Sequence, residues 1–138
     1  MAQQQSRTAA TLLIVDDHAP TLAAVRSLLG AAFPASRILT AGSAERALEL
    51  CVEDAPHVVV MDIVLPGIDG IEATRRIKSL LPDAGVVMLS SHDLAIYRDA
   101  AAGAGAGAFV AKSKAFRDLV PAVNSLLPAA FRLPGSGR

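Results

Sequence analysis

Val-Val-Val-Met-Asp-Ile-Val-Leu-Pro-Gly-Ile-Asp-Gly, residues 58–70, has the pattern of a buried strand followed by a loop. The first four residues are apolar and mostly β-branched, which is typical of a strand covered on both faces of a parallel sheet. Asp62 comes directly after this run, and the proline and glycines that follow predict a loop. Open α/β sheets bind their ligands outside the carboxyl ends of the strands, so Asp62 is a candidate functional residue.

Three other apolar runs also end in polar or charged residues. The first is followed by Asp16 and Asp17, the run at 86–89 by Ser90, and the run at 109–111 by Lys112. The carboxyl ends of parallel strands meet at one edge of a sheet. Three carboxylates, a hydroxyl and an ammonium are therefore expected to lie together.

Strands alternate with helices along the chain. Strands are predicted over 11–15, 37–41, 58–61, 86–89 and 108–111. Five helices are predicted between and after them: one with Pro20 in its first turn, one capped by Ser43, one capped by Asp69, one over 93–102 and one from Ser113 to Leu127. This alternation predicts an α/β fold with parallel strands and right-handed crossovers.

Length and composition indicate a single domain that binds neither nucleic acid nor membrane. The 138 residues carry no net charge, half of them are hydrophobic, and there is one cysteine, Cys51, which we expect to be buried. No apolar run approaches the length of a membrane helix. We expect a cytoplasmic protein with a disordered tail over 1–10, a domain over 11–128 and a flexible tail over 129–138.

Four motifs in order resemble the response-regulator receiver domain over residues 12–127. They are Leu-Ile-Val-Asp-Asp-His (13–18), Met-Asp-Ile-Val-Leu-Pro-Gly-Ile-Asp-Gly (61–70), Val-Val-Met-Leu-Ser-Ser-His (86–92) and Gly-Ala-Phe-Val-Ala-Lys (107–112). The wording of 68–77 is similar to receivers of nitrate-regulator and quorum-regulator type transcription factors. The resemblance implies a flavodoxin-like, doubly wound five-stranded parallel sheet of order 2-1-3-4-5 with five helices.

The predicted cluster of carboxylates also indicates a metal site on chemical grounds alone. Crowded carboxylates repel one another unless a hard cation neutralises them, and Mg²⁺ prefers such oxygen ligands. Asp17 would bind the metal directly, Asp16 directly or through water, and Asp62 would be both ligand and phosphoryl acceptor. Lys112 would contact a phosphoryl oxygen as a point charge, and Ser90 would donate a hydrogen bond to another. The resemblance selects Ser90 over Ser91 and adds the backbone carbonyl of Val64 as a metal ligand.

The resemblance also implies a function. A sensor histidine kinase or phosphotransfer protein would donate a phosphoryl group to Asp62 with Mg²⁺ as cofactor, and the chain would catalyse only its own phosphorylation and dephosphorylation. The switch would be Ser90 with Phe109, which could equally be a core residue. The output would be a contact between an unknown protein and the face built by the fourth helix, fifth strand and fifth helix, with homodimerisation left open.

Three functions from different classes remain open at this point. A stand-alone phospho-acceptor module is favoured, and the receiver part of a DNA-binding regulator is the first alternative. A Mg²⁺-dependent phosphohydrolase is the weakest, because Val64 occupies the position near the nucleophile where such an enzyme needs a second carboxylate. Asp16, Asp17 and Lys112 taken singly could also be ordinary surface residues.

Two residues depart from the usual receiver pattern. Ser113 follows the lysine where family members often carry proline, so no cis peptide is implied there. Pro121 falls inside the fifth predicted helix, where it removes a backbone hydrogen bond and clashes with the preceding turn. The helix is therefore predicted to bend or to start again between Phe116 and Ala122.

Overall fold

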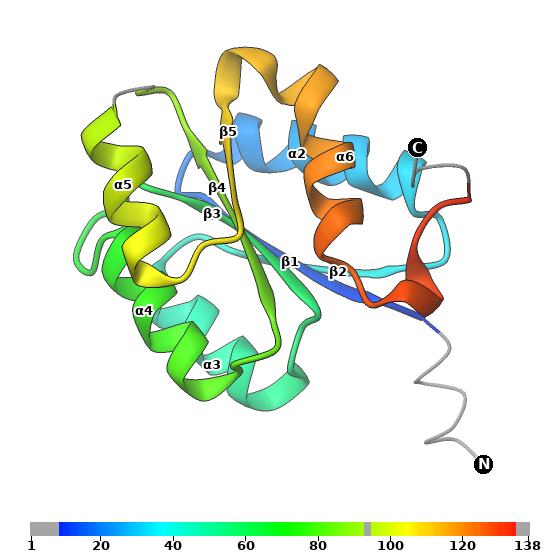
Figure 1. The fold of residues 1–138 in the computed structure, drawn as a ribbon, viewed down its shortest axis with the longest axis horizontal. Coiled ribbons are helices and arrows are strands. Elements are labelled where there is room, and N and C mark those ends of the chain that lie inside the picture. Colours follow the sequence, from blue (N-terminus) through cyan, green and yellow to red (C-terminus); the bar gives the residue numbers. More distant parts are fainter. Residues whose placement is uncertain (1–8, 93–94, 135–138) are drawn as a thin grey trace.

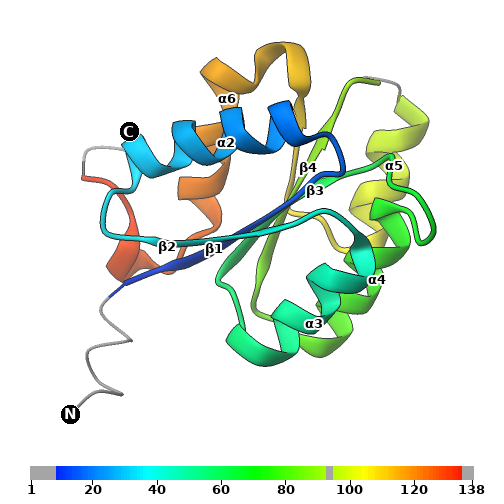
Figure 2. The same ribbon diagram turned by 180° about the vertical axis from the view of Figure 1, so that it is seen from behind.

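A parallel sheet lies between two layers of helices in the computed structural model, which describes residues 9–92 and 95–134 (Figures 1 and 2). The strands are β1 (Thr11–Val15), β2 (Arg37–Ala41), β3 (Val58–Asp62), β4 (Gly85–Ser90) and β5 (Ala108–Ala111). The helices are α2 (Ala19–Ala32), α3 (Ala44–Asp54), α4 (Gly70–Leu80), α5 (Ala95–Ala104) and α6 (Ala115–Leu126), with short 3₁₀ turns η1 (Lys112–Lys114) and η2 (Ala129–Phe131). The strand order is β2-β1-β3-β4-β5, so the predicted flavodoxin-like topology is confirmed.

The register of the strands brings their carboxyl ends to one edge. Val15 pairs with Met61, Asp62 with Leu89, and Ser90 with Ala111. The residues that end or follow β1, β3, β4 and β5 are therefore neighbours, as the sequence predicts. We refer to this side as the carboxyl edge and to the opposite side as the amino edge.

The central strand β3 is buried along its whole length. Val59 and Met61 belong to the apolar core beneath α3, α4 and α5, whereas Val58 and Val60 belong to the core beneath α2 and α6. This arrangement explains why β3 shows no alternation of polar and apolar residues. It also fixes the backbone that carries Asp62.

Side-chain caps start two helices on the α3, α4 and α5 face. Ser43 Oγ accepts a hydrogen bond from the backbone N–H of Arg46 at 3.1 Å, and Asp69 Oδ1 accepts one from Glu72 at 2.8 Å. Both caps were predicted, and both are confirmed. They fix where α3 and α4 begin relative to the strands before them.

Gly70 allows α4 to start directly against the end of β3. A Cβ atom at this position would collide with the carbonyl oxygen of Asp62 and would lie 2.8 Å from Ile63 Cα. The N–H of Gly70 donates to the carbonyl of Ile63 at 2.8 Å. Only glycine permits this close approach of two backbones.

Of the two outcomes predicted at Pro121, a new start of the last helix is not observed, and a bend stays a prediction. The residue lies inside α6, which runs as one helix from Ala115 to Leu126. Both Pro121 and Arg117, whose carbonyl loses its helical donor, are exposed, so water can bond that carbonyl. Ser113 is not the cap of this helix either; it belongs to η1, and the N-cap residue is Lys114.

The residues after 128 differ from the predicted flexible tail where the structure describes them. Phe131 packs edge-on against the ring of His57, with 5.0 Å between the centroids. The N–H of Leu133 donates to Asn124 Oδ1 at 2.8 Å. The apolar side chains of Phe131 and Leu133 extend the core beneath α2 and α6, which is why this segment follows the domain surface.

Some predictions fall on residues that the structure does not describe. These are the tail over 1–8, the last residues 135–138 and the start of the fourth predicted helix at 93–94. Within the described ranges, no helix combines the length and the hydropathy that a membrane span requires.

Candidate functional site

Three carboxylates converge at the carboxyl edge. Asp16, Asp17 and Asp62 each place one oxygen within 4.8 Å of the others. The side chain of Asp17 is exposed, whereas Asp16 and Asp62 are only 2% and 6% exposed. The sequence predicted this convergence from the strand ends alone.

Lys112 bridges the two buried carboxylates. Its Nζ lies 3.1 Å from Asp16 Oδ2 and 3.2 Å from Asp62 Oδ2. Burial disfavours the charged ammonium, but the nearby carboxylates of Asp16 and Asp62 outweigh it, so the pKa of Lys112 is raised. The lysine is therefore held in its charged form beside both acids.

Both carboxylate oxygens of Asp62 have partners. Oδ1 accepts a hydrogen bond from the N–H of Val64 at 3.2 Å, and Oδ2 accepts one from Lys112 Nζ. Burial, and after it the charge of Asp16, raise the pKa of Asp62, although Lys112 and the Val64 N–H act in the opposite direction. The site thus resists a second buried negative charge.

Asp16 is less well satisfied than Asp62. Its Oδ1 accepts a hydrogen bond from the N–H of His18 at 2.8 Å, just before α2 begins. Its Oδ2 is buried and has no hydrogen-bond donor, because Lys112 Nζ is near enough for an ion pair but does not form a hydrogen bond with it. A buried carboxylate oxygen without a donor is unusual in a folded protein.

The cluster fits a hard divalent cation. Carboxylate oxygens are the ligands that such a cation prefers, and the unbonded Oδ2 of Asp16 offers one without breaking a hydrogen bond. Asp17 is exposed, so water ligands could also reach the site. For Val64 the structure gives the N–H contact with Asp62, and the role of its carbonyl stays a prediction.

Ser90 and His92 form a tight turn after β4. Ser90 is buried, and its Oγ accepts a hydrogen bond from the N–H of His92 at 2.9 Å and donates one to the carbonyl of His92 at 3.1 Å. Ser91 is exposed. The hydroxyl of Ser90 is therefore engaged locally and would have to leave these bonds to reach a phosphoryl group at Asp62.

Phe109 is partly buried on β5 and packs against the core beneath α3, α4 and α5. The guanidinium of Arg98, from α5, lies 4.6 Å from the centre of its ring. A cation over an aromatic face is attractive. Sequence reasoning did not identify Arg98, because no pattern links a helix arginine with an aromatic residue eleven positions later on a strand.

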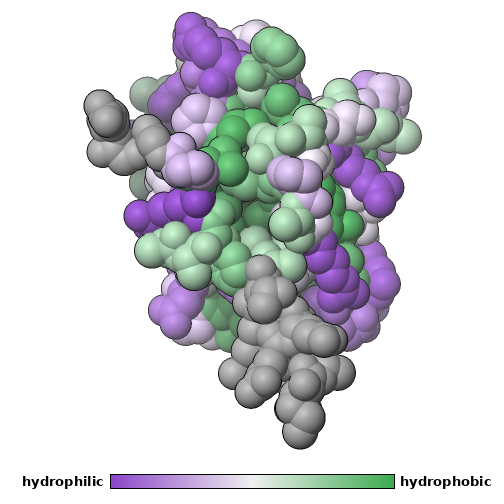
Figure 3. All heavy atoms as spheres, turned by 90° about the vertical axis from the view of Figure 1, so that its right-hand side faces the viewer, coloured by the Kyte–Doolittle hydropathy of each residue, from purple (hydrophilic) through white to green (hydrophobic). Residues whose placement is uncertain are grey.

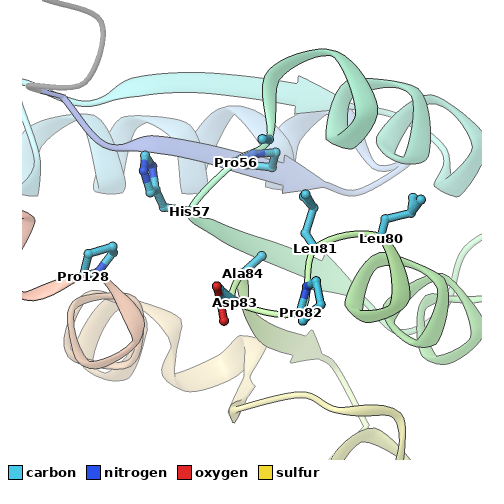
Figure 4. A pocket seen from close by; sticks show the side chains of 9 residues that line it. Pro56, His57, Leu80, Leu81, Pro82, Asp83, Ala84 and Pro128 are labelled. Atoms are coloured by element: carbon cyan, nitrogen blue, oxygen red, sulfur yellow. The ribbon is translucent and has the colours of Figure 1, made fainter. Parts of the chain in front are cut away.

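A separate hollow of about 290 Å³ lies at the amino edge (Figure 4). Its lining includes Pro56, His57, Leu81, Pro82 and Pro128. His57 has a structural role, since its Nδ1 accepts a hydrogen bond from the N–H of Thr11 at 3.0 Å.

Apolar residues also gather on the molecular face at the right of Figure 1, which Figure 3 shows from the front.

Comparison with known proteins gives a consistent result. A family model described as the response regulator receiver domain matches residues 12–124. Transcriptional activator protein ExaE of Pseudomonas putida is 38% identical over 117 residues, which cover 84% of this chain and 54% of that protein. Response regulator UvrY of Escherichia coli is 33% identical over 115 residues, covering 83% of this chain and 53% of that one.

Solved structures agree with these relatives. A two-component response regulator of the LuxR family from Aurantimonas is similar with a TM-score of 0.79 and 34% identity, over 86% of this chain and 84% of that chain. The chain spans about half the length of the curated relatives that it matches. The family match, the strand order and the predicted likeness to quorum-regulator receivers agree, and the chain belongs to the response regulator receiver domain family of two-component systems.

Proposed function

We propose that this receiver domain accepts a phosphoryl group on Asp62 from a phosphohistidine of a sensor histidine kinase or a phosphotransfer protein. The observation that carries the proposal is the position of Lys112 Nζ, 3.1 and 3.2 Å from one oxygen of Asp16 and one of Asp62. An ammonium already held beside both acids can also pair with a negatively charged phosphoryl oxygen that arrives at Asp62. The chain would catalyse this transfer and its own dephosphorylation only.

Asp62 is the residue suited to act as nucleophile. One of its oxygens would form a bond to phosphorus as the phosphorus–nitrogen bond of the donor breaks, and the electron pair would remain on the histidine nitrogen, which takes up a proton. The Val64 N–H bond to Oδ1 and the Lys112 bond to Oδ2 orient the carboxylate for this attack. Positioning of this kind supplies much of the catalysis in phosphoryl transfer.

Asp16, Asp17 and Asp62 would hold Mg²⁺ as cofactor, with the carbonyl of Val64 as a further ligand. When bound, the cation would offset the negative charge of the acids and of the arriving phosphoryl group. Lys112 would share this task by turning its ammonium toward a phosphoryl oxygen. Its raised pKa keeps it charged over the neutral range.

The response to phosphorylation would pass through Ser90 and Phe109. Ser90 would exchange its two bonds with His92 for one with the phosphoryl group, and Phe109 would move from beneath Arg98 toward the space that is vacated. New bonds that exist only in the phosphorylated form are what can shift such an equilibrium. The face built by α5, β5 and α6 would then contact the output protein.

Intact-mass measurement tests the acceptor assignment. Wild type and Asp62→Asn are incubated with a small phosphodonor and magnesium, and phosphorylation is expected in wild type alone. Asp17→Asn should be labelled more slowly, and chelation of the metal should stop labelling of wild type. Undiminished labelling of Asp62→Asn would contradict the proposal, and Asp99→Asn, at an exposed position on α5, is the control.

A second candidate keeps the same chemistry and changes the output. The curated relatives include a protein named as a transcriptional activator, and the chain corresponds to about half of it. The receiver could therefore control an attached DNA-binding portion instead of a separate protein. The reading frame around the coding sequence separates the two, since only the second candidate requires a further domain in the same frame.

A further inference from the structure

The groove between α3 and α4 is apolar at its centre and lies away from the acidic cluster. It has a volume of about 520 Å³ and is lined by Leu48, Glu49 and Val52 from α3 and by Arg76, Ser79 and Leu80 from α4. Val52 is 72% exposed and Leu80 is 50% exposed. Isolated exposed apolar residues are common, but here two large ones share one groove.

The two helices are parallel neighbours. Each follows one strand of a parallel sheet and leads to the next on the same face, and they pack side by side (Figure 1). Glu49 is the sixth residue of α3 and Arg76 the seventh of α4, and both line the groove, so the two residues lie at similar heights; Val52 and Leu80 lie further along. One helix therefore presents an acid at the level where the other presents a base.

From this pattern we infer that the α3–α4 groove binds a second copy of this chain. A twofold axis running between the helices and parallel to them would place α3 of one copy over α4 of the other. Glu49 would then meet the partner copy's Arg76, and Val52 would meet the partner copy's Leu80, each twice. An axis perpendicular to the helices would instead bring Glu49 onto Glu49 and Arg76 onto Arg76, which repel.

The existing ion pairs of these residues do not oppose this contact. Glu49 pairs with Arg46 at 2.9 Å and Arg76 pairs with Glu72 at 3.1 Å, and all four side chains are more than a third exposed. Exposed pairs of this kind contribute little to stability. They can be shared with or exchanged for partners in a second copy.

The size of the face predicts a weak dimer. Two 11-residue helices side by side cover roughly 16 by 20 Å, from a rise of 1.5 Å per residue and a diameter of about 10 Å. Stable dimers bury about 800 Å² on each partner, so this contact belongs to the transient class. Association is expected at concentrations of about 0.1–1 mM.

Charge reversal gives a direct test by sedimentation equilibrium at about 1 mM, a concentration suited to weak complexes. Wild type is expected to form dimers, whereas Glu49→Arg alone and Arg76→Glu alone should each weaken self-association at least about tenfold. An equimolar mixture of the two variants should associate again, because each contact then pairs an arginine with a glutamate. Loss of helix stability within either variant cannot produce this recovery.

An apolar variant and a matched control complete the test. Val52→Lys should weaken the dimer, while Phe116→Lys, at an 89% exposed position on α6, should not. Asp62→Asn should dimerise like wild type, so failure of the phosphorylation proposal leaves this inference untouched. Monomeric wild type at about 1 mM, or a variant mixture that stays monomeric, would overturn the inference.

Discussion

The two edges of the sheet differ in how well the hydrogen bonds of their polar groups are satisfied. At the carboxyl edge, Asp16 and Asp62 are buried beside each other, share one lysine, and leave one carboxylate oxygen without a hydrogen-bond donor. At the amino edge, Nδ1 of the partly buried His57 accepts a hydrogen bond from the N–H of Thr11, and the ring packs on Phe131. The carboxyl edge therefore retains unfavourable electrostatics that a ligand can relieve, whereas the amino edge contributes stability.

The comparison also extends to the backbone. At the carboxyl edge, Gly70 is surrounded by the main chain of Asp62 and Ile63, which cannot move without moving the site. At the amino edge, a Cβ at Gly85 would lie 2.6 Å from Leu126 Cβ, at the last residue of α6. We therefore expect a side chain added at Gly70 to destabilise the protein more than one added at Gly85.

The largest effect is expected from Gly70→Ala. The added methyl group collides with backbone, so the free energy of unfolding should fall by about 3 kcal/mol or more. Gly85→Ala should cost less, about 1–2 kcal/mol, because the last turn of α6, which carries Leu126, can move without moving the site. Urea denaturation followed by circular dichroism measures both.

Gly103→Ala is the matched control for these glycine variants. Nothing lies within 4 Å of a Cβ at Gly103, and the residue is in α5. Alanine should raise stability there by up to about 1 kcal/mol through helix propensity. Equal losses in Gly70→Ala and Gly85→Ala would remove the distinction between the two edges.

At the amino edge, His57→Ala should lower the free energy of unfolding by about 1–3 kcal/mol. The substitution leaves the N–H of Thr11 without its acceptor and removes the ring contact with Phe131. His57→Asn retains an acceptor at the same place and should recover part of the loss. Phosphorylation of Asp62 should be unchanged in both variants, and a reduced rate would show that the edges are coupled.

At the carboxyl edge, the effect should be opposite to that of His57→Ala: Asp62→Asn should raise the free energy of unfolding at neutral pH by about 1 kcal/mol. The pKa of Asp62 is raised in the folded protein, by burial and by Asp16, so the folded state binds this proton more tightly than the unfolded state. Its contribution is therefore favourable at low pH and is lost as the pH rises from the ordinary value of 3.8 through the raised folded value.

Two measurements check this sign. As the pH is lowered toward the ordinary pKa of 3.8, wild type should gain stability relative to Asp62→Asn. Added magnesium should raise the unfolding temperature of wild type more than that of the variant. A pH-independent difference, or destabilisation by Asn, would mean that Lys112 more than compensates for the burial of Asp62.

The smallest effect is expected for Arg98→Gln. Loss of the cation above Phe109 should destabilise the observed position of that ring by about 0.5 kcal/mol, the free energy of an exposed cation–π contact. The ring should then move inward more readily when beryllofluoride replaces the phosphoryl group, as seen in aromatic chemical shifts. A double-mutant cycle with Phe109→Leu separates this contact from other effects of the arginine.

The strands and the acidic cluster could be predicted because each depends on short, strong patterns, whereas the strand order followed only from the resemblance to receiver domains. An apolar run such as 58–61 fixes a buried strand, and parallel pairing then brings Asp16, Asp17 and Asp62 together. The caps Ser43 and Asp69 were equally readable, since their bonds are local.

What could not be predicted depends on contacts between distant residues or on solvent. Pro121 remains inside α6 because its face is exposed, and exposure is not encoded in the proline itself. Phe131 follows the domain because His57, 74 positions earlier, offers its ring. The missing donor at Asp16 Oδ2 depends on the orientation of Lys112, which residue spacing does not determine.

The bond between Gly70 and Ile63 has a consequence for how this protein can diverge. It closes the loop between them at its base, while Val64 is tied to Asp62 on one side and the Asp69 cap to Glu72 on the other. Residues 66–68 lie between these anchors, and closing a slightly longer loop costs little entropy. This loop can therefore vary in length and sequence while the carboxylate of Asp62 keeps its geometry.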